Sequence, residues 1–319
     1  MKYIRLNTTD PYYNLALEEY LFKNADDDVF ILWQNEPSVI AGKNQNVYAE
    51  VDLEYAKTHG IHVCRRITGG GAVYHDLGNV NYTFISANGS GKMLDFEYFS
   101  RPIRNAVGRL GVASRMSDRN DIECEGGKFS GNAQHAEGGR ILHHGTLLFD
   151  TDFNVLEAVL KVDKEKLDYR AVKSCRSRVV NLASLVSQKI SVDNFLCQIE
   201  RSVCEELCAD YTEAPKNEEI DLLYTRNKTH EWIFSDRRYL TKYTVERKKK
   251  YSFGLVKAEL ELFGDTLRNV KISGDFFGQE PIEKLEAILI GMRRCDILAV
   301  DPSPYIGGMS GKELYELLT

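Results

Sequence analysis

Residues 121–149 read DIECEGGKFSGNAQHAEGGRILHHGTLLF. Two glycine pairs, Gly126-Gly127 and Gly138-Gly139, divide this stretch into segments at 121–125, 128–134 and 140–149. Paired glycines supply the positive φ angles that tight hairpin turns require, so the three segments are predicted to be neighbouring antiparallel strands. With helical spacing elsewhere in the chain, this pattern indicates an α+β fold with a largely antiparallel sheet rather than alternating βα units.

Further helices and strands are expected on both sides of these hairpins. Asp10-Pro11 predicts a helix start, because aspartate is a good N-cap and proline is tolerated in the first turn. Residues 96–110 have helical spacing and end at Gly111, a candidate C-cap. Residues 29–33 and 79–85 read as strands, which gives a sheet with flanking helices.

The length of the chain predicts two domains. A chain of 319 residues exceeds the usual size of one hydrophobic core. The basic run at 246–250 is followed by two apolar strands, a glycine-containing turn and a helical segment near 282–290. We therefore expect a large domain over residues 1–247 and a small α+β accessory domain over residues 248–319.

Composition narrows the class of protein. The net charge of -6 gives no support for binding nucleic acid through a general phosphate-neutralising surface. The N-terminus lacks the apolar core of a signal peptide, and no window has the roughly 18 apolar residues of a membrane span. Seven unevenly scattered cysteines suit reduced thiols. We expect a cytoplasmic protein without membrane or nucleic-acid partners.

A triglycine segment is the first candidate site. Residues 65–79 read RRITGGGAVYHDLGN, so Arg65-Arg66 precede Gly69-Gly70-Gly71 and His75-Asp76 follow them. Glycines let a bulky group approach the backbone, and guanidinium groups match carboxylate and phosphate geometry. The alternative is a plain glycine turn beside solvent-exposed arginines. Neither a dinucleotide fingerprint nor a P-loop is present, because the glycines lead into a strand-like segment and no G-K-[ST] follows them.

Lys128 and the adjacent histidines His143 and His144 mark the second and third candidate segments. Lys128 begins a segment rich in small residues, and Asp121, one hairpin away, could orient the lysine or hold a cation. The alternative is that Lys128 is an ordinary solvent-exposed lysine at the edge of the sheet. Neighbouring residues of a strand face opposite sides, so of His143 and His144 we expect one in the core and one at a cleft. A hydrolytic triad with Ser130 is disfavoured, because the chain lacks a G-x-S-x-G elbow.

Taken together, these motifs resemble the lipoate–protein ligase A family. The resemblance covers nearly the whole chain, and its ordered set of motifs is specific although each one alone is weak. Its motifs are DPYYNLALEE at 10–19, QNEPSVIAGKNQN at 34–46, RRITGGGAVYHDLGN at 65–79, KFSGNA at 128–133, HHGTLL at 143–148 and VKSCRSRVVNL at 172–182.

The resemblance implies the fold shared by biotin ligases and class II aminoacyl-tRNA synthetases. It also implies a reaction in two steps, in which lipoate and ATP form lipoyl-adenylate and an acceptor lysine then takes the lipoyl group. Lys128 would be the catalytic residue, between the lipoate carbonyl and the α-phosphate. Substrate contacts would come from Arg66, Gly70, Gly71, His75, Ser130, Gly131, Ala133, His144 and Gly145. Nucleotide contacts would come from Gly71, Ala72, Val73, Tyr74, His75, Asn79, Asp121, Lys128, Arg176 and Arg178.

The same resemblance implies the substrates and partners. ATP and Mg²⁺ would be co-substrate and ion, with Asp121 the leading protein contact of the metal, lipoic acid the substrate, and no tightly bound cofactor. Residues 172–178 would form a loop over the adenylate, and the accessory domain would move between the two steps. The acceptors would be lipoyl domains of 2-oxoacid dehydrogenase complexes and the glycine-cleavage carrier protein. We expect a monomer.

Two other functions stay open at this point. One is an octanoyl or lipoyl transferase of the same fold that works without ATP. Some such enzymes use a cysteine nucleophile, for which Cys175 and Cys124 are the candidates. The other is a non-catalytic protein that binds lipoate or lipoyl carriers, against which the intact Lys128 and Arg66 argue.

Overall fold

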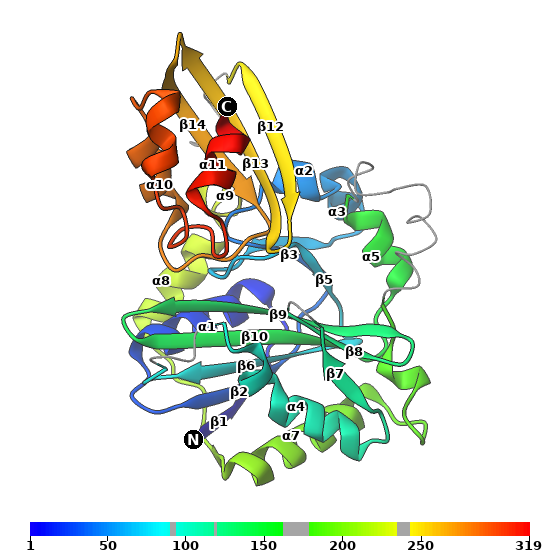
Figure 1. Ribbon diagram of the computed structural model, residues 1–319. Helices are drawn as coiled ribbons and strands as arrows, with labels where there is room; N and C mark the ends of the chain where they lie inside the picture. Colours follow the sequence, from blue (N-terminus) through cyan, green and yellow to red (C-terminus); the bar gives the residue numbers. More distant parts are fainter. Residues whose placement is uncertain (90–93, 118–119, 162–178, 235–242) are drawn as a thin grey trace.

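An eight-stranded mixed sheet forms the largest part of the computed structural model (Figure 1), which describes residues 1–89, 94–117, 120–161, 179–234 and 243–319. The strand order is β11-β1-β2-β6-β10-β9-β8-β7, with parallel pairing only at β11–β1 and β1–β2 within the described residues. These strands are β1 (Lys2–Arg5), β2 (Val29–Trp33), β6 (Asn79–Ser86), β7 (Ser114–Met116), β8 (Asp121–Cys124), β9 (Gly127–Glu137), β10 (Arg140–Leu148) and β11 (Asp210–Tyr211). The predicted α+β class and largely antiparallel sheet are confirmed.

The double-glycine hairpins have the predicted backbone conformation. Gly126, Gly127, Gly138 and Gly139 all have positive φ angles, between 58° and 134°. They connect β8 to β9 and β9 to β10, which pair antiparallel. Turn chemistry that can be read in the sequence therefore fixes the β10-β9-β8 part of the sheet.

Helices cover both faces of this sheet, as Figure 1 shows. On one face lie α4 (Phe96–Arg109) and α7 (Val192–Leu207), whose apolar residues pack with Phe129 and Tyr82 of the sheet. On the other face lie α1 (Pro11–Asn24) and α8 (Glu218–Asn227). Asp10 caps α1 by accepting hydrogen bonds from the backbone N–H groups of Tyr12 and Tyr13, as predicted.

A second, three-stranded sheet carries the triglycine segment. Its order is β4-β3-β5, with β3 (Ser38–Ala41), β4 (His62–Arg65) and β5 (Val73–His75). The triglycine segment connects β4 to β5. Beside this sheet lie α2 (Val47–Glu50), α3 (Leu53–Thr58), α5 (Phe153–Val159) and α9 (His230–Phe234), and between α5 and α7 the chain forms the short 3₁₀ helix η2 (Leu182–Ser184).

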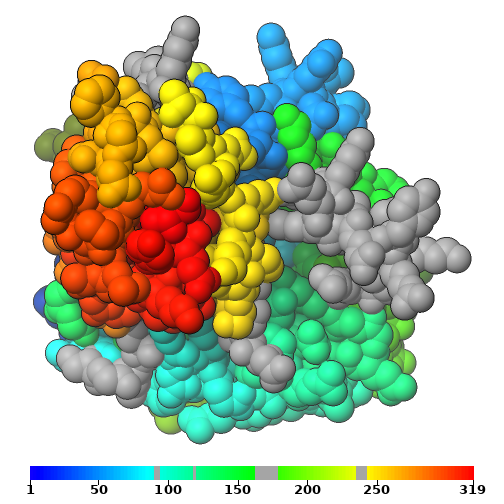
Figure 2. Space-filling model, turned by 45° about the horizontal axis from the view of Figure 1, so that its top comes forward, coloured from blue at the N-terminus to red at the C-terminus, as the bar shows by residue number. Residues whose placement is uncertain are grey.

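The C-terminal part builds a separate hydrophobic core. An antiparallel sheet of β12 (Val245–Tyr251), β13 (Gly254–Phe263) and β14 (Thr266–Gly274) packs against α10 (Ile282–Leu289), η4 (Arg294–Ala299) and α11 (Gly311–Leu318). Figure 2 shows this unit, yellow to red, resting against the blue and green N-terminal part. The division at residues 247 and 248 stays a prediction. Among the described helices, none is long and apolar enough to cross a membrane.

Candidate functional site

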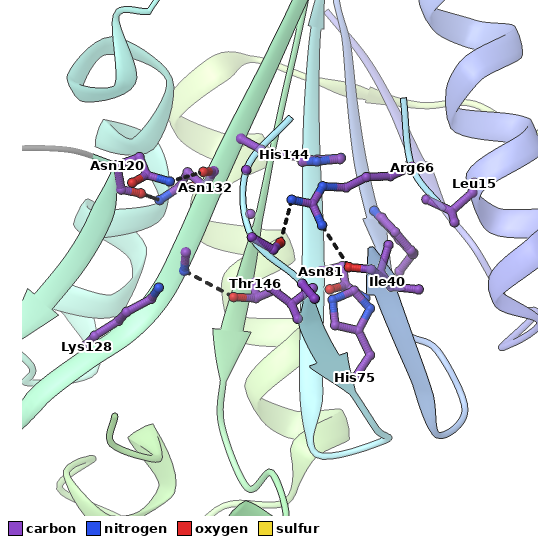
Figure 3. A pocket seen from close by; sticks show the side chains of 18 residues that line it. Leu15, Ile40, Arg66, His75, Asn81, Asn120, Lys128, Asn132, His144 and Thr146 are labelled. Carbon is purple, nitrogen blue, oxygen red and sulfur yellow. Dashed lines mark hydrogen bonds between the residues drawn. The ribbon is translucent and has the colours of Figure 1, made fainter. Parts of the chain in front are cut away.

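A cavity of about 140 Å³ lies between the eight-stranded sheet and the triglycine segment (Figure 3). It brings together Lys128 of β9, Arg66 of the segment after β4, and His144 of β10. Its lining residues are Leu15, Trp33, Ile40, Arg66, Gly70, Gly71, Ala72, Val73, His75, Asn81, Asn120, Lys128, Gly131, Asn132, Ala133, His144, Gly145 and Thr146. The lysine and the triglycine segment therefore face one common cavity.

Arg66 is a buried clamp on the triglycine segment. Its Nη2 donates to the carbonyls of Gly69 (2.7 Å) and Gly71 (2.8 Å), and its Nη1 donates to the carbonyl of Ile40 (2.9 Å). Only 5% of the residue is exposed, which excludes the alternative of a solvated arginine beside a plain turn. Burial lowers the pKa of Arg66 to about 10, and the charge of Glu18 opposes that shift. The guanidinium remains charged at neutral pH.

The three glycines meet three different requirements. A Cβ on Gly69 would collide with the carbonyl oxygen of Phe276 in the C-terminal unit. Gly70 has a φ of 87°, and a Cβ there would lie 3.2 Å from the ring of Phe277. A Cβ on Gly71 would meet no atom within 4 Å, so this glycine keeps the cavity open. Gly70 and Gly71 both line the cavity, while Gly69 and Gly70 also allow close contact with the C-terminal unit.

A β-bulge turns Lys128 toward the cavity. Ile122 pairs with Ser130 and Glu123 pairs with Lys128, which leaves Phe129 as an extra residue in β9. The bulge puts Lys128 on the same face as Gly131, which a regular strand would place on the opposite face. A Cβ on Gly131 would lie 2.9 Å from the Lys128 Nζ.

Asp121 holds the ammonium group of Lys128. Their Oδ1 and Nζ atoms are 2.8 Å apart, and about 30% of each side chain is exposed. Asp121 does not line the cavity itself. Of the two roles considered from the sequence, orienting the lysine is the one that this geometry supports.

The histidines of the cavity have defined hydrogen-bond partners. His75 is buried, and burial together with nearby Arg66 lowers its pKa to about 3, so the ring is neutral. The Asn35 side-chain amide donates to His75 Nδ1 (3.1 Å), which leaves the ring proton on Nε2. His144 lines the cavity, whereas His143 is fully buried and stacks on Phe99. The expected split between a core histidine and a cleft histidine is confirmed.

Four predicted contact residues lie off the cavity wall: Tyr74, Asn79, Asp121 and Ser130. Tyr74 alternates with Val73 and His75 along β5, so its side chain packs into the opposite cluster with Val39 and Ile61. This placement does not support contact between the Tyr74 side chain and a nucleotide. Asn79 and Ser130 are fully buried, and Asn79 donates to Asn81 (2.8 Å). Arg176, Arg178 and the 172–178 loop fall outside the described residues.

Seven lining residues were not predicted: Leu15, Trp33, Ile40, Asn81, Asn120, Asn132 and Thr146. Thr146 lies two residues beyond His144 on the same face of β10, so strand alternation could have identified it. Leu15, Trp33 and Ile40 come from three separate elements and carry no local signal other than hydrophobicity. Only the three-dimensional packing brings them to one cavity.

The described residues offer neither a cluster of metal ligands nor a favourable thiolate nucleophile at the site. Among the described residues there is no group of three or more His, Cys, Asp or Glu side chains that could hold a metal ion. Asp121 offers one carboxylate beside Lys128, which suits an ion brought by a substrate better than a resident metal. The thiol of Cys124 lies off the cavity wall, and burial raises its pKa, which disfavours a thiolate nucleophile.

The sequence belongs to known protein families over most of its length. Residues 10–203 match the lipoyl protein ligase A/B catalytic domain, and residues 241–318 match the bacterial lipoate protein ligase C-terminus. The lipoate-protein ligase LplJ of Bacillus subtilis (strain 168) is 35% identical over 324 residues, which cover 98% of both chains. Lipoate–protein ligase 1 of Staphylococcus aureus is 36% identical over 295 residues, 91% of this chain and 90% of the relative.

Solved structures agree with this assignment. The P. falciparum LipL1 structure in complex with lipoate has a TM-score of 0.80 at 26% identity, covering 99% of this chain and 97% of that one. A lipoate-protein ligase A bound with ATP has a TM-score of 0.62 at 29% identity, covering 73% and 98%. A bipartite ligase from Thermoplasma acidophilum, described with its E2 lipoyl domain, has a TM-score of 0.65 at 31% identity, covering 76% and 98%. On these matches and the site geometry, the chain belongs to the lipoate–protein ligase family.

Proposed function

We propose that the chain ligates lipoate to protein lysines in two ATP-dependent steps. In the first, a lipoate carboxylate oxygen attacks the α-phosphorus of ATP, the bond to the β-phosphate breaks, and pyrophosphate leaves. In the second, the ε-amine of an acceptor lysine attacks the carbonyl carbon of lipoyl-adenylate. The carbon–oxygen bond to the phosphate breaks, AMP leaves, and the amine loses a proton.

The observation that carries this proposal is that Lys128 and the triglycine segment held by Arg66 line the same cavity. Adenylation brings a carboxylate against a polyanion, so charge repulsion and positioning are the main obstacles. Preorganised cations reduce both, and one well-placed donor is commonly worth about 10²–10³ in rate. The compact ammonium of Lys128 suits contact with oxygens of both reactants, while Arg66 keeps the glycine backbone in place.

The cavity itself fits the acyl tail. Leu15, Trp33, Ile40 and Val73 give it an apolar wall. Figure 3 shows Leu15, Ile40 and His75 on one side and Lys128 on the other. We place the lipoyl tail on the apolar side and the carboxylate toward Lys128. The lipoate-bound and ATP-bound relatives support these two substrates.

The nucleotide is proposed to bind at the Lys128 end. MgATP would bring its own ion, and Asp121 would be a protein carboxylate within reach of that ion. The ion pair between Asp121 and Lys128 would then have to rearrange as the triphosphate binds. Gly71, Ala72 and Val73 would contact the nucleotide from the triglycine segment.

Lipoyl domains are the proposed acceptors. The archaeal relative is described together with its E2 lipoyl domain, which supports this class of partner. Carrier proteins of glycine cleavage are a second proposed acceptor, and a monomer is the proposed state. We propose residues 1–247 as the adenylating domain and residues 248–319 as the accessory domain. The contact of the Gly70 N–H with the Phe276 carbonyl (3.4 Å) would open if the accessory domain moves between steps.

Exchange between ATP and labelled pyrophosphate tests the proposal. Pure protein should catalyse this exchange only when lipoate is added, and it should transfer the lipoyl group to a purified lipoyl domain. Absence of exchange, together with transfer from an octanoyl carrier protein without ATP, would instead establish the transferase function. Absence of both activities, with lipoate still bound, would favour the non-catalytic binding protein.

A further inference from the structure

The buried carboxylate of Glu18 is the common end of two hydrogen-bond chains that start at the cavity wall. Glu18 lies on α1, only 2% of the residue is exposed, and it does not line the cavity. Its Oε1 contacts His144 Nδ1 at 2.9 Å and Thr83 Oγ1 at 2.6 Å. The same helix carries the lining residue Leu15.

The first chain runs from Arg66 to Glu18. Arg66 Nε donates to Thr68 Oγ1 at 2.8 Å, and Thr68 Oγ1 lies 2.9 Å from His144 Nε2. A carboxylate can only accept, so His144 must carry its proton on Nδ1. With Nε2 unprotonated, the ring accepts there from the single hydrogen of the Thr68 hydroxyl, whose oxygen accepts from Arg66. With this proton pattern, each hydrogen bond of the chain has its donor on the Arg66 side and its acceptor on the Glu18 side.

The second chain runs from Trp33 to the same oxygen. Trp33 Nε1 donates to Thr83 Oγ1 at 3.0 Å. Because the hydroxyl hydrogen of Thr83 goes to Glu18, its oxygen is left to accept from the indole. Trp33 lines the cavity and Thr83 is fully buried.

We infer that Glu18 is a positioning residue that sets the orientation of both Arg66 and Trp33 without touching substrate. The Arg66 chain fixes the clamp on the triglycine segment and so affects the chemical step. The Trp33 chain fixes part of the apolar wall and so affects binding of the acyl tail. This inference rests on the proposed function for its kinetic consequences, but its hydrogen-bond pattern can be tested without it.

The kinetic test separates the two chains by breaking each one alone. Thr68→Val should lower kcat of lipoate-dependent pyrophosphate exchange about 10-fold to 100-fold and leave KM for lipoate within about threefold, because small misplacements at a reacting centre have effects of this size. Thr83→Val should instead raise KM for lipoate about 10-fold and leave kcat within about threefold. Glu18→Leu should do both, and Glu18→Gln, which keeps an acceptor oxygen, should recover most of the activity.

A double-mutant cycle and a matched control complete the test. Thr68→Val should add less than about threefold to the kcat loss of Glu18→Leu, because both variants break one chain. Glu19→Gln is the control, since Glu19 is the next residue of α1, is equally buried, and pairs instead with Lys23 (2.7 Å). It should lower the melting temperature and leave kcat and KM unchanged. Additive losses, or a kcat loss in Glu19→Gln as large as that in Glu18→Leu, would overturn the inference.

Nitrogen-15 NMR of the histidine rings tests the chain directly. His144 should carry a proton on Nδ1 and none on Nε2 in the wild type, and it should lose this pattern in Glu18→Leu. A proton on Nε2 of His144 in the folded wild type would overturn the inference even if exchange activity is normal. Should the wild type show the Nδ1 tautomer but no exchange, the proposed function fails while the chain itself stands.

Discussion

Gly131→Ala tests how closely the position of Lys128 controls the reaction. The added Cβ would lie 2.9 Å from Nζ and 3.2 Å from Cε of Lys128, whereas ordinary contacts begin at 3.4 Å. The ammonium must therefore move by about 0.5 Å, the difference between 3.4 and 2.9 Å. Because a misplacement of about 1 Å can cost about 10²-fold, we expect adenylate formation to slow about 10-fold.

Stability should change little in this variant. The flexible end of a lysine can shift at low cost, and alanine is favoured over glycine within a strand by about 0.5–1 kcal/mol. The assay is single-turnover formation of lipoyl-adenylate, with the free energy of unfolding measured by urea denaturation. Gly108→Ala is the matched control, because a Cβ there meets nothing within 4 Å on α4. The control should be as active as the wild type, and a fully active Gly131→Ala would show that the exact position of the Lys128 ammonium does not limit the reaction.

Further variants test the triglycine segment, the clamp and the buried histidine. Gly71→Ala should raise KM for lipoate about 10-fold without loss of stability, whereas Gly69→Ala should destabilise the protein by about 1–3 kcal/mol in urea denaturation through its overlap with the Phe276 carbonyl. Arg66→Lys should lower kcat about 10²-fold in pyrophosphate exchange, since one ammonium nitrogen cannot replace the three guanidinium nitrogens that bond Thr68, Ile40 and the two glycine carbonyls. Burial keeps the pKa of His143 well below its ordinary value, so the unfolded chain binds a proton that the native state does not. The free energy of unfolding should therefore fall as pH drops below about 6.5, by up to about 1.4 kcal/mol per pH unit, and His143→Gln should remove this contribution in urea titrations at several pH values.

Local turn chemistry made much of the fold predictable. The glycine pairs around β9 require positive φ angles, and Asp10-Pro11 carries its own capping group, so both features can be read without tertiary contacts. The pairing of Lys128 and Arg66 in one cavity followed from the combination of motifs rather than from either motif alone.

Features that depend on tertiary packing could not be predicted. The bulge at Phe129 reverses the face of Lys128, and no residue type in that segment marks where the extra residue falls. Gly69 and Gly70 are required by Phe276 and Phe277, which lie about 200 residues later in the chain. The role of Glu18 likewise depends on its contacts with distant strands.

In the proposed reaction, the ammonium of Lys128 promotes attack of the lipoate carboxylate on ATP. The most direct test of this role is lipoate-dependent pyrophosphate exchange by Lys128→Met, which removes the charge but keeps a long side chain. If Lys128 has this role, the variant should lose about 10²–10³-fold in exchange rate while it remains folded and still binds lipoate. Exchange at the wild-type rate would contradict this role.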